Sequence, residues 1–180
     1  PTFRPVSPAD QAGFKKALKL DPKNPVLMIT GGGLGAQRLN EAVARIAKTL
    51  IARQPLLHIL HIAGPGKKAD LVTRYKKQLG TKAVQVIVEE FVSNSYVYSG
   101  AADVIVARAG ATTLAEFAAQ SKACIIVPNQ HLTGGHQLKN AEVLAADKSI
   151  VVVPDEDVQK NPELLLQQIE KLLTSRTLRQ

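Results

Sequence analysis

Residues 29–43, ITGGGLGAQRLNEAV, decide the fold of this chain. The apolar run VLMI at residues 26–29 leads into them, and such a run is typical of a buried parallel strand. Four glycines stand close behind it: Gly31, Gly32, Gly33 and Gly35. Apolar residues then recur at helical spacing, which predicts a helix over residues 37–52. The stretch therefore predicts a strand, a glycine-rich turn and a helix.

This arrangement favours an anion-binding loop. Glycine lets the backbone adopt positive φ and lets a ligand approach without meeting a Cβ atom. The first turn of the following helix presents unpaired N–H groups at the positive end of the helix dipole, which suits a phosphate. The alternative is a tight connection without a ligand, and four glycines in five residues argue against it. We expect the loop to hold the diphosphate of a nucleotide.

The residues around the loop narrow the kind of nucleotide. A Walker loop is excluded because no Gly-Lys-Ser/Thr follows. Gly31 and Gly33 match the first two glycines of the dinucleotide fingerprint, but Ala36 or Gln37 stands where the third belongs. The next strand ends in AGPG at residues 63–66, with no acid for a ribose 2′-hydroxyl. We therefore do not expect NAD.

Composition places the chain among soluble globular domains. It has 180 residues, 45% hydrophobic and 21% charged, which suits one domain with a substantial core. Its single cysteine, Cys124, lies in an apolar run and is expected to be a buried thiol. No apolar run approaches membrane-spanning length. Because the chain opens with Pro1, we expect it to be a fragment of a longer protein.

The net charge of +8 raises the question of anionic partners. One basic group lies near the start of the chain: Lys15, Lys16, Lys19 and Lys23. A second group lies on and around a helix: Lys67, Lys68, Arg74, Lys76, Lys77 and Lys82. Aromatic residues make up only 4% and tryptophan is absent, so nucleic acid is not expected as a partner. Two interpretations stay open, solvated faces and an affinity for an anionic membrane surface.

Strand and helix patterns alternate along the chain. The predicted strands cover residues 26–30, 57–62, 84–88, 104–107, 124–127 and 150–153. The predicted helices cover residues 8–20, 37–52, 68–79, 111–120, 135–147 and 162–173. This alternation predicts an α/β fold with a mostly parallel six-stranded sheet and helices on both faces. Residues 1–24 are expected to form a linker segment, and residues 25–180 a single domain.

Ligands of such sheets bind beyond the carboxyl ends of the strands. One loop of this kind, residues 108–116, runs from Arg108 through Gly110 into a helix. Thr113 and Glu116 have the spacing of a capping box, which is one interpretation of Glu116. The other is that the Glu116 carboxylate accepts hydrogen bonds from two ribose hydroxyls. Arg108 either pairs with an acid or organises the loop around the ligand.

A second polar loop covers residues 128–140. Its amides, Gln137 and Asn140, suit sugar hydroxyls, although capping of the following helix is a competing role. His131 and His136 are five residues apart with no Cys, Asp or Glu between them, so a metal site is not expected. No nucleophile elbow precedes a helix, which argues against a Ser-His-Asp hydrolase. His61 is expected at the edge of the core or facing a loop, without chemistry.

Three segments together resemble the carboxyl-terminal half of the MurG-type N-acetylglucosaminyltransferases, of glycosyltransferase family 28. They are TGGGLGAQRLNEAV at residues 30–43, ADVIVARAGATTLAEFAA at 102–119 and IIVPNQHLTGGHQLKNAEVLAA at 125–146. The resemblance covers nearly the whole chain in the right order. It implies a Rossmann-like, doubly wound domain that forms one half of a GT-B fold and binds UDP-N-acetylglucosamine. No cofactor or metal is implied.

The resemblance also implies site residues. The glycines 31–35 would face the diphosphate, with Arg108 and Gly110 on the neighbouring loop. Glu116 would bind the ribose hydroxyls and Val92 would present its backbone to the uracil. The remaining residues that it implies are Arg4, near the nucleotide, and His136 and Gln137, along the sugar. The chain departs from the family in two places. Gly33 stands where the family often has a serine, and Gly134 and Gly135 stand where acidic residues are frequent.

The implied reaction transfers N-acetylglucosamine with inversion from UDP-N-acetylglucosamine to lipid I, which makes lipid II for the peptidoglycan of the cell wall. The acceptor and the catalytic base would belong to an amino-terminal domain, so no catalytic residue is assigned here and this half alone is expected to be inactive. The enzyme would lie on the cytoplasmic face of the inner membrane. The alternatives are another lipid-directed glycosyltransferase, a UDP-sugar epimerase, and a non-catalytic nucleotide-binding subunit.

Overall fold

The structure is a computed structural model that describes residues 4–31, 36–128 and 150–175. Six strands form one sheet: β1 (Val26–Thr30), β2 (His58–Ile62), β3 (Val86–Glu89), β4 (Val104–Ala107), β5 (Ala123–Ile126) and β6 (Ile150–Val152). They lie in the order β3-β2-β1-β4-β5-β6, and every neighbouring pair is parallel. This order is that of a doubly wound Rossmann-like sheet, so the predicted fold class is confirmed.

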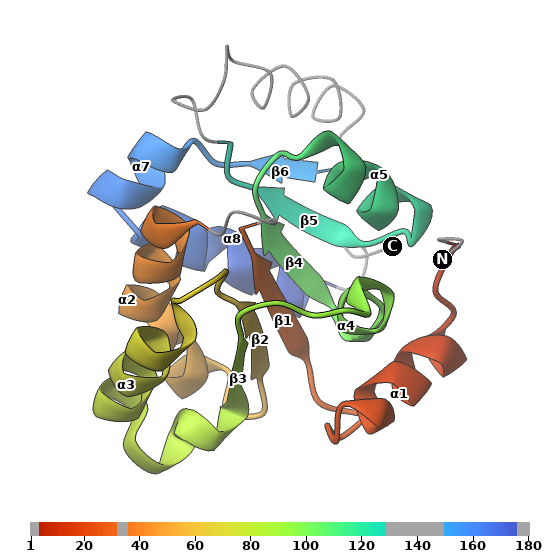
Figure 1. The fold of residues 1–180 in the computed structure, drawn as a ribbon, viewed down its shortest axis with the longest axis horizontal. Helices are drawn as coiled ribbons and strands as arrows, with labels where there is room; N and C mark the ends of the chain where they lie inside the picture. The colour runs from red at the N-terminus through yellow and green to blue at the C-terminus, as the bar shows by residue number, and fades with distance from the viewer. Residues whose placement is uncertain (1–3, 32–35, 129–149, 176–180) are drawn as a thin grey trace.

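Helices pack on both faces of the sheet (Figure 1). They are α1 (Pro8–Ala17), α2 (Gln37–Arg53), α3 (Lys68–Leu79), α4 (Ser95–Ala101), α5 (Ala111–Ala119), α7 (Asp155–Lys160) and α8 (Glu163–Thr174). A 3₁₀ helix, η1 (Gly80–Gln85), follows α3. Side chains of successive strand residues point to opposite faces, so Leu27 and Ile29 pack in the layer of α2 and α8. Met28 packs in the layer of α4 and α5.

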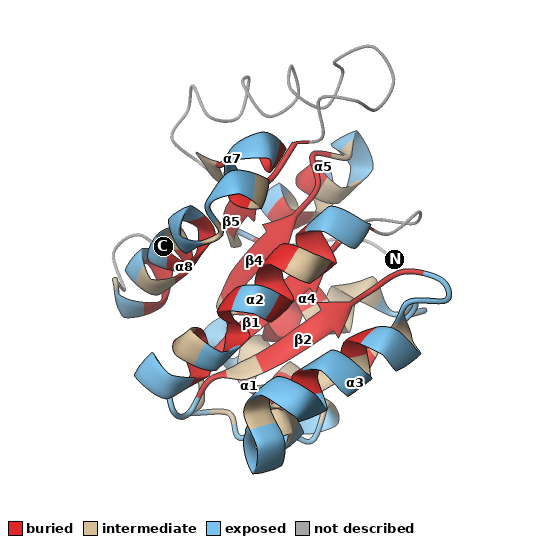
Figure 2. Cartoon of the chain, turned by 90° about the vertical axis from the view of Figure 1, so that its left-hand side faces the viewer, coloured by how far each residue is buried: buried red, intermediate tan, exposed pale blue. Residues whose placement is uncertain are grey.

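The central strands β1 and β4 are buried along their whole length, whereas the edge strands β3 and β6 are mostly half-buried; Figure 2 shows the sheet from the side of α2 and α3. All five residues of β1 are buried, because helices cover both faces of this central strand. This two-sided burial explains why the strands read as continuous apolar runs in the sequence.

The predicted elements agree with the observed ones to within about three residues at each end. The sequence analysis missed η1, α4 and α7, which are short and have few turns in which periodicity could show. The helix predicted over residues 135–147 lies outside the described residues. The linker expected over residues 1–24 contains α1, which begins with a Ser7 capping box and packs on α4. The proposed domain boundary stays a prediction.

One expectation about the core was wrong. His61 does not lie at the edge of the core, since it is fully buried in β2 between β1 and β3. Its Nδ1 atom lies 2.8 Å from the Tyr75 hydroxyl and its Nε2 atom 3.0 Å from Asn40 Oδ1. Asn40 donates through Nδ2 to the Ala63 carbonyl, so its Oδ1 accepts from His61 Nε2–H. The ring is therefore the neutral Nε2–H tautomer, and its Nδ1 accepts from Tyr75.

This burial predicts a pH-dependent stability. Burial lowers the pKa of His61 to about 3, whereas in the unfolded chain it titrates near its ordinary value of 6.5. Below that value the unfolded chain binds a proton that the folded protein does not, so the free energy of unfolding falls as pH falls. We expect His61 to lower the free energy of unfolding by up to about 1.4 kcal/mol for each pH unit between about pH 6 and pH 5. Urea denaturation at several pH values measures it.

The variant His61→Gln is expected to flatten this slope. His58→Gln is the matched control, because half-buried His58 has a pKa lowered by partial burial and contributes a smaller part. Equal slopes in the wild type and in His61→Gln would show that His61 is not kept neutral by the fold.

Candidate functional site

The candidate site lies at the carboxyl-end edge of the sheet, where the chain changes direction. From β1 the chain winds outward to β3 and then returns to β4, which pairs with the other side of β1. The loops after β1 and β4 therefore diverge, and a crevice between such loops is the usual ligand site of this fold. Gly31 follows β1 here, and residues 108–110 follow β4.

A hollow of about 150 Å³ lies beside this point, on the face of the sheet that α4 and α5 cover. An engineered protein cavity of about that size admits a benzene ring, so one aromatic ring of a ligand fits here. The lining residues come from β1, the end of β2, the β3–α4 loop, the start of α4 and the first two turns of α5. They are Met28, Thr30, Ile62, Glu90, Phe91, Val92, Ser95, Thr113, Glu116 and Phe117.

Glu116 lies in the lining of this hollow and is not part of a helix cap. Helix α5 begins at Ala111 with Gly110 as its N-cap residue, and no side chain caps it. Thr113 is therefore inside the first turn, so the capping box that its spacing suggested is not formed. In the part of the chain that the structure describes, the half-buried Glu116 carboxylate has no hydrogen bond or ion pair. It is available to a ligand.

The β3–α4 loop forms the opposite wall. Val92 lines the hollow and is half-buried. This placement is compatible with a backbone that faces a bound base. Phe91 lies at the rim with 74% of its surface exposed, which is unusual for a large aromatic residue. An exposed aromatic face and a backbone edge together suit a planar heterocycle.

Two helices begin at this edge without side-chain caps. Helix α2 has Ala36 at its N-cap and no acidic residue in its first turn, and α5 has Gly110. Their first N–H groups are therefore available to an anion at the positive ends of two dipoles. A Cβ at Gly110 would meet Thr113 only at ordinary contact distance, so packing within the described chain does not require a glycine there.

Arg108 is buried and lies in an ion pair. Its Nη1 atom donates to the Val127 carbonyl at 3.0 Å and lies 2.6 Å from Asp155 Oδ1. Asp155 is the first residue of α7 and also lies 3.5 Å from Arg38 Nη1 of α2. Of the two interpretations of Arg108, pairing with an acid is what the structure shows, and a ligand contact stays a prediction. The pair joins the carboxyl end of β4 to α7 and α2.

Arg4 is not part of the described lining of the hollow. Its side chain is 68% exposed, and its guanidinium lies 3.7 Å from the Asp10 carboxylate of α1. A role toward the nucleotide therefore stays a prediction. Five of the expected site residues lie outside the described residues: Gly32, Gly33, Gly35, His136 and Gln137.

Sequence analysis missed several residues of the site. Thr30 and Ser95 line the hollow, and Phe117 forms its floor with Met28. Thr30 and Phe117 stand in the quoted segments, but no spacing marks any of these residues for a site, because only the fold brings them together. Asp155 had a signal, since PDED at residues 154–157 is a helix start with acids in its first turn.

Cys124 takes no part in the site. It is buried in β5, and burial raises the pKa of its thiol to about 12, which confirms the expectation of an inert core thiol. Within the described ranges, no three His, Cys, Asp or Glu side chains gather where they could hold a metal ion. None of the described helices combines the length and apolar character that a bilayer crossing requires.

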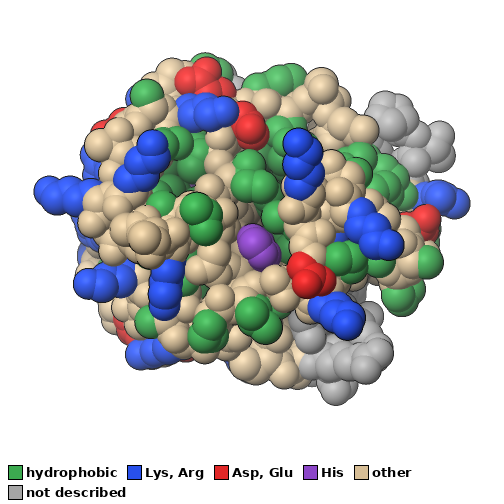
Figure 3. All heavy atoms as spheres, turned by 90° about the horizontal axis from the view of Figure 1, so that it is seen from below, with side chains coloured by type: hydrophobic (Ala, Val, Ile, Leu, Met, Phe, Trp, Pro, Cys, Tyr) green, Lys and Arg blue, Asp and Glu red, His purple; other side chains and the backbone are tan. Residues whose placement is uncertain are grey.

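The Lys and Arg side chains do not gather into one patch on the underside of the molecule. On this face they are spread among acidic and apolar groups (Figure 3). Lys15, one of the expected surface cations, is instead buried and pairs with Asp103 at 2.8 Å. An affinity of the remaining cations for an anionic membrane stays a prediction.

Comparison with known proteins adds an independent line of argument. Residues 26–180 match the family described as the glycosyltransferase family 28 C-terminal domain. A UDP-N-acetylglucosamine–N-acetylmuramyl-(pentapeptide) pyrophosphoryl-undecaprenol N-acetylglucosamine transferase from Idiomarina loihiensis is 36% identical over 151 residues. The match covers 83% of this chain and 40% of that protein. The protein of the same name from a Geobacter species is 33% identical, over 87% of this chain and 41% of its own length.

Solved structures agree. The crystal structure of MurG from Acinetobacter baumannii matches 97% of this chain and 46% of its own, with a TM-score of 0.74 and 26% identity. The C-terminal domain of a group 1 glycosyl transferase from Francisella tularensis matches 98% of this chain and 88% of its own. Its TM-score is 0.65, and at 19% identity it shows the fold alone. The chain spans about two fifths of the length of the curated relatives it matches.

Proposed function

The chain belongs to the family of glycosyltransferase family 28 C-terminal domains, and from this membership we propose that it binds the sugar nucleotide in an N-acetylglucosamine transferase. The donor would be UDP-N-acetylglucosamine, and the acceptor the pyrophosphoryl-undecaprenol muramyl peptide that the relatives' names state. A further, amino-terminal part of the enzyme would bind that acceptor and supply the catalytic base. The product would be lipid II, made at the cytoplasmic face of the plasma membrane.

One observation supports this proposal above the others. A hollow that fits one ring lies between the Val92 loop and the Glu116 carboxylate, which no described residue binds, beside two helix starts without side-chain caps. Uracil would occupy the hollow, with the backbone of Val92 at its edge. The ribose hydroxyls would then donate to Glu116, since a carboxylate accepts hydrogen bonds and cannot donate them.

The same placement accounts for the leaving group. The diphosphate would lie between Gly31 at the end of β1 and the start of α5 at Gly110. As the bond from the anomeric carbon to the diphosphate breaks, negative charge develops on the departing UDP. Oriented N–H groups at the two helix starts stabilise that charge, because they need no reorganisation. Gln137 and His136 would lie along the sugar.

Isothermal titration calorimetry tests the proposal on the 180-residue chain. UDP, UDP-N-acetylglucosamine, UDP-glucose and UDP-galactose are titrated in turn, with ADP as the control for the base. We expect all uridine nucleotides to bind and ADP not to bind, and UDP-N-acetylglucosamine to bind more tightly than the two sugars that lack the acetamido group. Equal affinity for the three sugars would favour a different transferase or an epimerase. No binding of any uridine nucleotide would refute the proposal.

A further inference from the structure

Helix α4 carries part of the wall of the hollow. Ser95, its first residue, lines the hollow, and Val92 lies in the loop that leads into it. The helix has only seven residues and no side-chain cap at its start. An isolated helix of this length is not stable, so its position depends on what packs against it.

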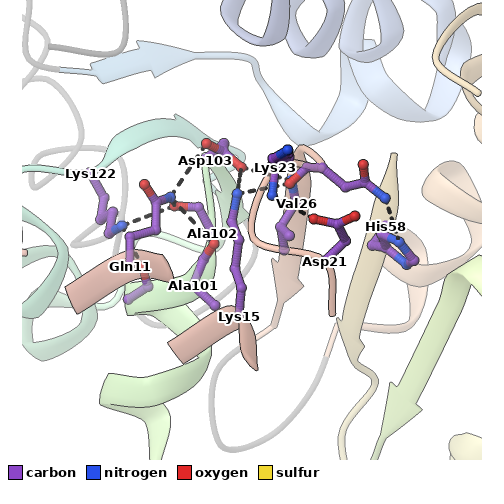
Figure 4. A network of polar contacts seen from close by, with 12 residues as sticks. Gln11, Lys15, Asp21, Lys23, Val26, His58, Ala101, Ala102, Asp103 and Lys122 are labelled. Carbon is purple, nitrogen blue, oxygen red and sulfur yellow. Dashed lines mark hydrogen bonds and ion pairs between the residues drawn. The ribbon is translucent and has the colours of Figure 1, made fainter. Parts of the chain in front are cut away.

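Contacts with other segments hold the far end of α4. Gln11 of α1 donates through Nε2 to the carbonyls of Ala101 at 3.3 Å and Ala102 at 2.9 Å. Lys122 donates through Nζ to the carbonyls of Gly100 at 2.8 Å and Ala102 at 2.9 Å. Figure 4 shows these two side chains converging on the end of the helix. Carbonyls that lack a partner within the helix are thus satisfied, and a cation stands at the negative end of the dipole.

The side of α4 is packed against α1 through one aromatic ring. Phe14 of α1 meets the ring of Tyr96 edge to face, with 5.4 Å between ring centroids. The Phe14 ring also lies directly on Gly100, where a Cβ would come within 2.5 Å of Phe14 Cδ2. Real Cβ atoms essentially never come so close, so Gly100 is a glycine because α1 occupies the space of its side chain.

Helix α1 is in turn fixed to the sheet. The buried Lys15 Nζ atom lies 2.8 Å from Asp103 Oδ2 and donates to the Asn24 carbonyl at 2.8 Å. The same Asp103 oxygen accepts the backbone N–H of Val26, the first residue of β1. Figure 4 shows this group at the amino-end edge of the strands. The contacts therefore link α1 to α4 and to the starts of β1 and β4.

We propose that Phe14 and Gln11 of α1 are positioning residues for the nucleotide, which set the place of α4 and hence of Ser95 and Val92 in the wall of the hollow. Displacement of α1, the first described helix of the chain, would then be transmitted along α4 to the donor site. This inference rests on the proposed function, because it takes the hollow to be the place of the uracil ring.

The variant Gly100→Ala tests this inference, because it places a methyl group in the space that the Phe14 ring occupies. Alanine is favoured over glycine within a helix, so the added methyl acts only through its clash with Phe14. We expect the Kd for UDP to rise about fivefold to tenfold, which lies within the roughly twofold to 30-fold effect of mutations that change coupling without touching the ligand. We also expect the amide NMR resonances of Ser95 and Val92 to shift in the protein without ligand.

Further variants separate positioning from stability. Gly13→Ala makes the same exchange in α1, where a Cβ would meet nothing within 4 Å. It should leave the UDP affinity and the Ser95 and Val92 amide resonances unchanged. The double variant Gly100→Ala with Phe14→Ala removes the ring that the methyl strikes. Phe14→Ala alone should also weaken UDP binding, and adding Gly100→Ala to it should cause no further loss, because the methyl then meets no ring.

The outcomes are distinct. Unshifted Ser95 and Val92 resonances in Gly100→Ala, or a lower UDP affinity in the double variant than in Phe14→Ala alone, would overturn the inference. If Gly100→Ala does not fold, Gln11→Ala withdraws the hydrogen bonds to α4 by a milder route and is judged by the same two measurements. If the wild-type chain binds no UDP, the proposed function fails, while the resonances still decide whether α1 positions α4.

Discussion

Replacing Asp155 with alanine is expected to lower the free energy of unfolding by about 3–5 kcal/mol, the cost of leaving a buried charge without its partner. Asp155 is 1% exposed and lies 2.6 Å from the guanidinium of Arg108, which is itself buried. Neither carboxylate oxygen is aligned as a hydrogen-bond acceptor, so the contact is an ion pair that a neutral side chain cannot replace. Urea denaturation measures the loss. Small domains have about 5–15 kcal/mol in total, so this loss is large.

Asp157→Ala is the matched control for this variant. It removes an acid from the same first turn of α7, but Asp157 is exposed, so only the interaction with the helix dipole is lost, about 0.3–1 kcal/mol. The double variant Arg108→Met with Asp155→Leu removes both charges and should recover most of the stability. A loss below about 1 kcal/mol in Asp155→Ala would show that the pair is not buried as described.

The second large effect is expected in ligand binding. Glu116→Ala should weaken UDP binding by about 1–3 kcal/mol, the scale for hydrogen bonds to a charged group, which is roughly a fivefold to 150-fold rise in Kd. The melting temperature should change little, because the Glu116 carboxylate has no hydrogen bond or ion pair in the described chain and does not cap α5. Calorimetry with UDP and a thermal melt measure the two quantities.

A nucleotide without the ribose 2′-hydroxyl identifies the contact. The wild type should bind 2′-deoxy-UDP more weakly than UDP, and Glu116→Ala should distinguish the two much less. Glu90→Ala is the control, because Glu90 is an acid in the same lining, on the β3–α4 side, that the proposal gives no role. Unchanged UDP affinity in Glu116→Ala would remove the ribose contact from the proposal.

The roles of single side chains were harder to predict than the elements that carry them. Thr113 and Glu116 have the spacing of a capping box, but α5 begins two residues earlier, at Ala111, so that spacing had no structural meaning. His61 alternates with apolar residues in the sequence, which resembles a strand edge. Its full burial depends on Asn40 and Tyr75, two partners from separate helices.

The sequence by itself determined the fold class and the alternation of the main strands and helices along the chain, and it predicted the edge of the sheet where a ligand would bind. This was possible because a strand buried on both faces needs consecutive apolar residues, and because a glycine-rich turn before a helix is visible within a short stretch of sequence. Only the tertiary structure decided that Arg108 pairs with Asp155, and that Phe14 occupies the space beside Gly100. These contacts join residues that are 47 and 86 positions apart. No local pattern records such pairs, because they depend on how the helices pack against the sheet and each other.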